Sequence, residues 1–232
     1  MITDTLHILS PFLYGLFVSK LKSINPCPDN YFMKLARYHH NIFLSALSLL
    51  MLIGITIGNY QTDKLSSINN MLCKSYDNNY YALTSSQLFL YSKYIEWGDT
   101  LFLHLSGKTI SMLQYTHHMS TALLMYFNTS YYLSPHIYVF MSSNCAIHVI
   151  MYLYFAYPNG FLNKYRKTIT QVQILQHIIC LLTIFHTRCL DNCKQNPNGN
   201  ELGFILYSMY LFYFSLFYLK AYIMNYYNKV KI

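Results

Sequence analysis

The sequence predicts an all-α polytopic membrane protein with about seven transmembrane helices, and three observations support this fold class. Of the 232 residues, 54% are hydrophobic and only 10% are charged, whereas an average soluble domain is about 25% charged. Apolar stretches of roughly spanning length recur along the whole chain. Lys and Arg are distributed unevenly over the loops between them, as in other multi-pass proteins. We therefore expect a single membrane domain over residues 1–232.

A helix that crosses a bilayer needs about 20 mainly apolar residues. The first candidate is short, and it either spans the membrane or lies in the interface, which leaves a six-span layout as the alternative. The chain begins "MITDTLHILS", without the basic region of a secretory signal, so we expect this stretch to stay in the mature protein. The candidate spans are residues 5–19, 39–59, 83–105, 111–128, 131–155, 169–187 and 202–224.

The basic residues predict the orientation of these spans. If the N-terminus lies outside the cytosol, eleven Lys and Arg fall on cytosolic segments, four fall on the opposite side, and Lys93 falls inside a helix. This asymmetry predicts a cytosolic C-terminus. The net charge of +8 is therefore explained by topology. Since the basic residues form short scattered clusters and not one stripe, we expect no nucleic-acid partner.

Cysteines mark the two long loops on the far side of the membrane, residues 60–82 and 188–201. If that side is an oxidising lumen, Cys73 can pair with Cys189 or with Cys193, and the sequence leaves the choice open. Cys145 and Cys180 fall in apolar helices, where we expect buried thiols.

Polar side chains inside the candidate spans form four groups, and such residues are costly at membrane depth unless they serve a site or a buried network. The first group is "KYIEWGDT". Lys93 and Glu96 share a helix face, and Asp99 lies about 60° further round. One interpretation is a structural Lys93–Glu96 ion pair. The other is a site, because that pairing leaves Asp99 free to orient a histidine.

The next three spans each carry a polar group of the same kind. Packing or interhelical hydrogen bonding can explain a lone polar residue, but it explains less well two adjacent histidines with a glutamine one turn before them. Four helices that each present a polar face predict a shared interior cavity. The polar members are Gln114, His117 and His118 in "QYTHH", Asn144, His148 and Tyr152 in "NCAIHVIMYLYF", and Thr170, Gln173, Gln176 and His177 in "TITQVQILQHI".

The histidines leave two chemical classes open, since imidazole either binds metal or acts as an acid, base or nucleophile. Membrane di-iron desaturases and hydroxylases would need several histidine boxes. The chain has ten histidines, but only His117 and His118 resemble such a box, and Gln114 stands at its first ligand position. A di-iron enzyme is therefore the least favoured alternative, and we expect no metal.

Taken in order, the four groups resemble the motifs of ELO-type fatty acid elongases. "KYIEWGDT" fits K-x-x-E-x-x-D-T, and "QYTHH" fits H-x-x-H-H with Gln114 in place of the first histidine. "NCAIHVIMYLYF" fits N-x-x-x-H-x-x-M-Y-x-Y-[YF], and "TITQVQILQHI" fits T-x-x-Q-x-x-Q, with His177 where Phe is usual. Each motif alone is modest, but four in order on the predicted helices are specific, and the helix layout extends the resemblance over nearly the whole chain.

The resemblance implies a fold, a reaction and a location. Six helices would form a barrel around an acyl tunnel, in a multi-pass protein of the endoplasmic reticulum membrane. The enzyme would be a very-long-chain 3-oxoacyl-CoA synthase, which condenses a long-chain acyl-CoA with malonyl-CoA to 3-oxoacyl-CoA, CO2 and CoA without a cofactor. Besides both substrates and membrane lipid, the implied partners are the ketoreductase, dehydratase and enoyl reductase of the elongation cycle.

The resemblance also implies roles for the motif residues. His117 would carry the acyl group as an acyl-imidazole, His148 would act at the malonyl step, and His118 would join them in the catalytic set without an assigned role. A non-catalytic seven-helix lipid carrier or receptor is the competing interpretation, and it would not need this set. The remaining substrate-binding or orienting candidates are Lys93, Glu96, Asp99, Gln114, Asn144, Tyr152, Thr170, Gln173 and Gln176.

Overall fold

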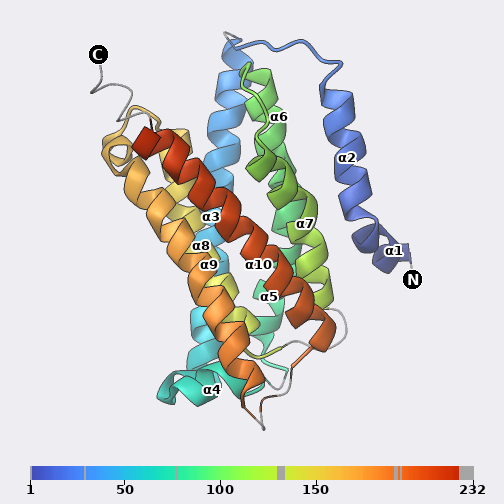
Figure 1. Cartoon of the computed structure of the whole chain (residues 1–232), viewed down its shortest axis with the longest axis vertical. Helices are drawn as coiled ribbons and strands as arrows, with labels where there is room; N and C mark the ends of the chain where they lie inside the picture. The colour runs from blue at the N-terminus through green and yellow to red at the C-terminus, as the bar shows by residue number, and fades with distance from the viewer. Residues whose placement is uncertain are drawn as a thin grey trace.

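The regular structure of the protein is helical (Figure 1). The computed structural model describes residues 2–28, 30–76, 78–129, 134–190, 193 and 195–224, and no strand occurs among them. The prediction of an all-α polytopic membrane protein is confirmed. Four described helical segments are long and apolar enough to cross a membrane: Tyr31–Gln61, Ile137–Ala156, Phe161–Arg188 and Pro197–Met224. The other three predicted spans are formed by shorter or more polar helices.

Six long helices form a closed ring. Each packs against two neighbours in the order α3, α8, α9, α10, α7, α5 and back to α3, so the barrel implied by the resemblance is present. Buried apolar side chains such as Leu124, Phe140 and Tyr207 fill part of its interior. The ring helices are α3 (Tyr31–Gln61), α5 (Tyr80–Ile95), α7 (Met112–Thr129), α8 (Ile137–Ala156), α9 (Arg166–Arg188) and α10 (Pro197–Tyr218).

The first predicted span is two helices, α1 (Ile2–Ile8) and α2 (Ser10–Leu21), which lie to one side of the ring (Figure 1). Pro11 lies in the first turn of α2, where its missing N–H is tolerated, but a continuous helix would bring its ring against the carbonyl of His7. The helix therefore breaks at Leu9. Helix α2 packs against α7 and α6.

The predicted span 83–105 is also divided, at Glu96, into α5 and the nine-residue α6 (Trp97–Leu105). Ser92 donates a hydrogen bond to the Phe89 carbonyl, and Gly98 follows the break. Both features weaken a continuous helix at this point. The "KYIEWGDT" motif therefore lies across a helix junction.

Capping residues explain why two helices begin earlier than predicted. The side chains of Asn30 and Asn196 accept hydrogen bonds from the backbone N–H groups three residues later, at the starts of α3 and α10. Helix α8 instead starts later than predicted, at Ile137, after Pro135. Residues 131–133 of that predicted span lie outside the described residues. Helix α10 continues into a π-helical turn, Leu219–Met224.

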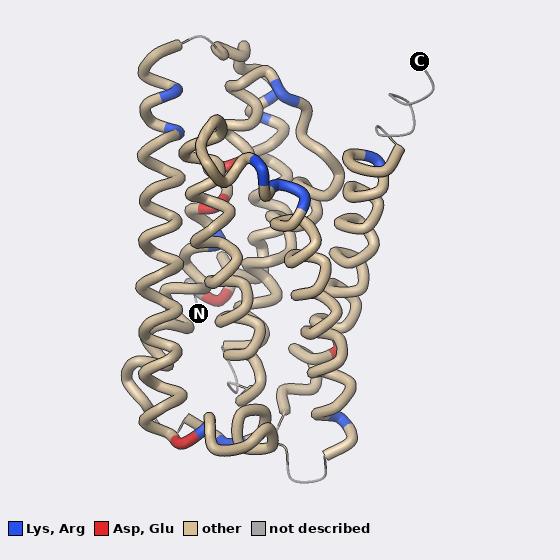
Figure 2. The backbone as a smooth tube through the Cα atoms, turned by 90° about the vertical axis from the view of Figure 1, so that its left-hand side faces the viewer, with Lys and Arg blue, Asp and Glu red and all other residues tan. Residues whose placement is uncertain are grey.

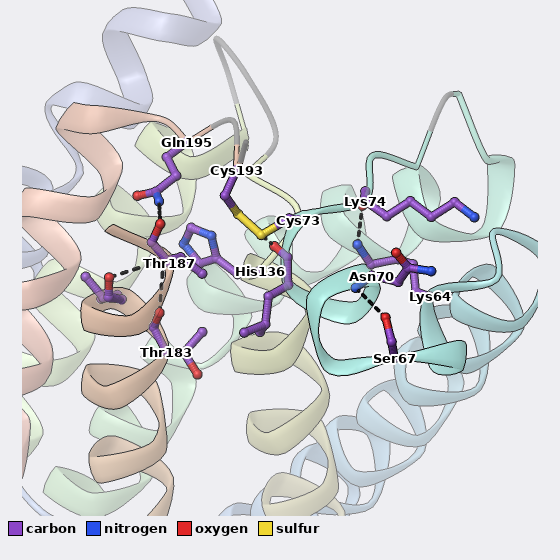
Figure 3. The surroundings of a disulfide bond; sticks show 12 residues. Lys64, Ser67, Asn70, Cys73, Lys74, His136, Thr183, Thr187, Cys193 and Gln195 are labelled. Atoms are coloured by element: carbon purple, nitrogen blue, oxygen red, sulfur yellow. Dashed lines mark hydrogen bonds between the residues drawn. A yellow bond between two sulfur atoms is a disulfide. The ribbon is translucent and has the colours of Figure 1, made fainter. Parts of the chain in front are cut away.

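A short cap covers one end of the ring, built from η1 (Lys64–Ser66), α4 (Ile68–Cys73) and the described residues between α9 and α10 (Figure 1). A disulfide joins Cys73 to Cys193 with a Cα–Cα distance of 4.7 Å (Figure 3). Of the two pairings that the sequence left open, the structure has the one with Cys193, and Cys189 is free and exposed. Cys145 and Cys180 are free and buried, as expected.

Basic residues gather mainly at the opposite end of the molecule, where α3 begins and η2 (Phe161–Tyr165) leads into α9 (Figure 2). The described basic residues at the capped end are Lys64 and Lys74 near α4, and Arg188 at the end of α9. The two ends of the molecule therefore differ in charge, and which end faces the cytosol stays a prediction.

Candidate active site

One cavity of about 710 Å³ runs from the basic end into the ring. Its lining includes exposed residues at the rim, such as Lys108 and Arg166, and buried ones further in, such as Gln176 and His177. The four polar groups of the sequence meet here, as the shared-cavity prediction requires. The candidate site residues that line the cavity are Glu96, Asp99, Gln114, His117, His118, Asn144, His148, Tyr152, Thr170, Gln173 and Gln176.

Lys93 is the one candidate site residue outside that lining, and it contacts a small adjoining cavity of about 30 Å³. Its Nζ donates a hydrogen bond of 2.8 Å to Oε1 of Glu96, and both side chains are almost fully buried. The ion pair is therefore present, and it is also part of the site. A second hydrogen bond, 3.2 Å long, connects Lys93 to Oδ1 of Asn144 on α8.

These contacts determine the hydrogen-bonding state of His148. Since Oδ1 of Asn144 accepts from Lys93, Nδ2 of Asn144 is left to donate to Nε2 of His148, 3.1 Å away. A ring nitrogen that accepts carries no proton, so the proton of the neutral imidazole is on Nδ1. That nitrogen lies 3.6 Å from Oε1 of Glu96. Lys93, Glu96, Asn144 and His148 therefore form one buried network across α5, the α5–α6 junction and α8.

Asp99 is the second acidic group in the cavity, and three side chains from three other helices surround it. Tyr152 on α8 donates to Oδ2 at 2.8 Å, and Nε2 of His40 on α3 lies 2.8 Å from Oδ1. Nε2 of His118 on α7 is 3.9 Å from Oδ2, which is longer than a hydrogen bond. The histidine that Asp99 contacts directly is thus His40, which the motif analysis missed. Its signal was a second adjacent pair, His39 and His40, at the start of a predicted span.

His117 lines both cavities. Its Nδ1 is buried and has no hydrogen-bond partner among the described residues. The ring lies 4.8 Å from the Tyr210 ring and 5.5 Å from the His118 ring, between centroids. An imidazole without a fixed partner keeps its lone pair available for chemistry.

The remaining motif residues complete the walls. Gln114 donates a hydrogen bond to Oγ1 of Thr100 at 3.3 Å. The Tyr14 hydroxyl of α2 is hydrogen-bonded to the same oxygen at 2.8 Å. On α9, Gln173 contacts Sδ of Met151 at 3.3 Å, and Thr170 donates to the Arg166 carbonyl at 3.2 Å.

His177 stands where the motif that "TITQVQILQHI" resembles usually has Phe. Its Nδ1 donates to the Gln173 carbonyl at 2.6 Å, since a carbonyl oxygen only accepts. The ring lies among aromatic side chains, 5.0 Å from Phe214 and 5.7 Å from Tyr210 between centroids. Within the part of the chain that the structure describes, no group of three His, Cys, Asp or Glu side chains is placed to hold a metal ion.

The fold and the site together define an all-helical multi-pass membrane protein with a buried, histidine-rich chamber inside a six-helix ring. The chain matches the ELO family, described as the GNS1/SUR4 family, over residues 3–230. It therefore belongs to this family.

Several curated relatives are similar to the chain. "Fatty acid elongase A" of Dictyostelium discoideum is 32% identical over 162 residues, which is 69% of this chain and 59% of that protein. "Fatty acid elongase 2" of Trypanosoma cruzi (strain CL Brener) is 29% identical over 198 residues, or 78% of this chain and 71% of that protein. "Long chain fatty acid elongase 2" of Caenorhabditis elegans is 33% identical over 161 residues, 62% of this chain and 57% of that protein. The match thus spans less than two thirds of the Dictyostelium and Caenorhabditis proteins.

Proposed function

We propose that the protein is an enzyme of fatty acid elongation that condenses a long-chain acyl-CoA with malonyl-CoA. The observation that carries the proposal is the meeting of His117, His118 and His148 with two acidic groups in one 710 Å³ cavity of the barrel. Membership of the ELO family and relatives named fatty acid elongases support it.

In the first half of the proposed reaction, the unprotonated nitrogen of His117 attacks the thioester carbonyl carbon. A bond forms between nitrogen and carbon, and the carbon–sulfur bond breaks. CoA leaves as a thiolate and takes the proton that the imidazole loses from its other nitrogen. The products are a neutral acyl-imidazole and CoA. Neutral imidazole suits this role because it is nucleophilic near neutral pH.

In the second half, malonyl-CoA loses CO2, and the electron pair of the broken carbon–carbon bond forms an enolate. The enolate carbon attacks the acyl group, the bond to His117 breaks, and the imidazole must regain one proton. Asn144, Gln173 and Gln176 line the cavity and can donate hydrogen bonds to the enolate or carbonyl oxygen. His148, which accepts a hydrogen bond from Asn144, would act at this step. None of these steps needs a cofactor.

The cellular setting is part of the same proposal. The protein would lie in the endoplasmic reticulum membrane with its basic end and its C-terminus in the cytosol. The basic rim, which includes Lys108 and Arg166, can attract the phosphates of CoA. The ketoreductase, dehydratase and enoyl reductase of the cycle would then act on its product.

The test uses the full chain, purified in detergent, with a series of acyl-CoA substrates and carboxyl-labelled malonyl-CoA. We expect release of labelled CO2 and 3-oxoacyl-CoA products two carbons longer than the substrate. His117→Ala should abolish both, while His39→Ala should not, because His39 is exposed and outside the cavity. A lipid carrier or receptor would bind lipid, release no CO2 and be indifferent to His117→Ala.

A further inference from the structure

His40 holds Asp99 from a helix that carries none of the four motifs. It lines the cavity, and its Nε2 lies 2.8 Å from Oδ1 of Asp99. The two side chains are 14% and 16% exposed, so the pair is reached from the cavity and not sealed from it. Because the carboxylate accepts, Nε2 carries the proton, and Nδ1 is the nitrogen left to exchange one with solvent.

The contact depends on a glycine. A Cβ atom added to Gly98 would lie 2.6 Å from Cε1 of His40, and no real Cβ comes so close to another atom. Gly98 lies in α6 directly before Asp99, where glycine is less favourable to a helix than alanine. Glycine at position 98 therefore leaves space for the His40 imidazole beside the Asp99 carboxylate.

Asp99 connects His40 to the buried part of the site. Its other oxygen accepts from Tyr152 and lies 3.9 Å from Nε2 of His118, whose ring neighbours that of His117. On α3, Arg37 lies one turn before His40 and donates to Ser106 at 2.8 Å. The other charged or histidine side chains that line the two cavities come from every neighbouring element: Lys93 and Glu96 from α5 and the junction, Lys108 from the loop after α6, His117 from α7, His148 from α8, and Arg166 and His177 from α9.

The proposed reaction consumes one proton in each turnover. In its first half, the proton that His117 loses leaves with CoA, so no proton is taken up from water or released to it. In its second half, malonyl-CoA loses its carboxylate as CO2, and the electron pair ends on the nitrogen of His117 that released the acyl group. One proton from water must neutralise that nitrogen, and general acids are how enzymes supply it.

We propose that His40 is a positioning residue for this proton. Its Nδ1 takes a proton from water in the cavity while Nε2 gives its own proton to Oδ1 of Asp99. The Asp99 carboxyl group then passes a proton, through water in the cavity that both residues line, to the nitrogen of His117 that released the acyl group. The inference rests on the proposed function, and it predicts that loss of His40 slows the second half of the reaction and not the first. It also assigns Gly98 a role, which is to let the imidazole reach the carboxylate.

The experiment compares the two half-reactions in His40→Gln, Gly98→Ala and the double variant of the purified full chain. CoA release from acyl-CoA alone reports the first half, and CO2 release with malonyl-CoA reports complete turnover. Gln keeps a donor for Asp99 but does not titrate, while Gly98→Ala displaces the ring without removing an ionisable group. The control is His39→Gln, at the exposed neighbouring histidine, which should behave as the wild type.

We expect both single variants to release CoA at the wild-type rate within about twofold, while complete turnover slows on the order of tenfold or more. Turnover of both should fall further as the pH rises, because water must then supply the proton directly. The double variant should be no slower than the slower single one. Equal losses in both half-reactions, or a wild-type pH profile in both variants, would overturn this inference alone. A wild-type chain that releases no CO2 would overturn the proposed function and the inference with it.

Discussion

At the scale of single residues, the charges of the site are held by partners that lie on other helices. Lys93 and Glu96 are nearly fully buried, and each has further contacts, with Asn144 and His148 respectively. Removing one member of such a pair leaves an uncompensated buried charge, whereas replacing both members is far less harmful.

Lys93→Met should therefore lower the free energy of unfolding by about 3–5 kcal/mol. The double variant Lys93→Met/Glu96→Leu should recover part of that loss, because neither charge remains. Thermal unfolding in detergent, followed by circular dichroism, measures both effects. A double variant less stable than Lys93→Met would contradict this account of the pair.

Lys64 is a buried charge at the capped end, outside the predicted spans. Its Nζ donates to the Lys74 carbonyl and lies 4.4 Å from the centre of the Tyr76 ring (Figure 3 shows Lys64 and Lys74). Burial, and then the charge of Lys74, lower the pKa of Lys64 from 10.5 to about 8. Between these two values the unfolded chain binds more protons at this site than the folded chain, so stability rises with pH.

We therefore expect the thermal midpoint of the wild type, minus that of Lys64→Met, to increase as the pH is raised from about 8 towards 10. Below about pH 8 the difference should be constant, because Lys64 is protonated in both states. Titrations shared by the two proteins cancel in the difference. A difference that stays flat or decreases above pH 8 would show that Lys64 is not held in this buried state.

At the scale of elements, α4 and the segment before α10 are tied by the Cys73–Cys193 disulfide, which links positions 120 residues apart. A covalent link over so long a loop restricts the unfolded chain strongly. Hydrogen bonds of the same region add to it, such as that between Gln195 and the Thr187 carbonyl at the end of α9 (Figure 3).

Cys73→Ser and Cys193→Ser should each lower the free energy of unfolding by about 2–5 kcal/mol. Each should also abolish the mobility difference between reduced and non-reduced protein on a gel. Cys189→Ser is the matched control, since Cys189 is free and exposed, and it should change neither property. A mobility difference that depends on Cys189 instead of Cys193 would contradict the observed pairing.

Sequence patterns predicted the elements better than their contacts. Hydropathy located each ring helix, because an apolar segment of spanning length has few other uses. It did not reveal the breaks at Leu9 and Glu96, which depend on a proline and on local side-chain bonds. The motifs located the residues that meet in the cavity. They did not reveal His40, because its contact with Asp99 arises from packing of α3 on α6 through the space at Gly98.

At the scale of the whole molecule, the ring is closed by six helix pairs, and its two ends differ in charge (Figure 2). The order of the helices around the ring could not be obtained from hydropathy, since hydropathy reports how apolar a helix is and not which neighbour its side chains fit. The charge difference between the two ends could be predicted from the sequence, because it follows from which loops carry Lys and Arg.

Two free cysteines test the orientation directly. Cys27 lies in the loop before α3 at the basic end, and Cys189 is exposed at the capped end. In sealed microsomes a membrane-impermeant maleimide should label Cys27 and not Cys189, and detergent should expose both. Cys27→Ser and Cys189→Ser assign the labelled site. Labelling of Cys189 alone before permeabilisation would reverse the orientation.

In the proposed reaction, His117 carries the acyl group. The most direct measurement is mass spectrometry of the purified protein after incubation with acyl-CoA in the absence of malonyl-CoA. We expect an added acyl group on His117, release of an equal amount of CoA, and disappearance of the adduct when malonyl-CoA is added. His117→Ala should show none of these. Complete turnover with no acylated protein, and with no CoA released before malonyl-CoA is present, would contradict this role of His117.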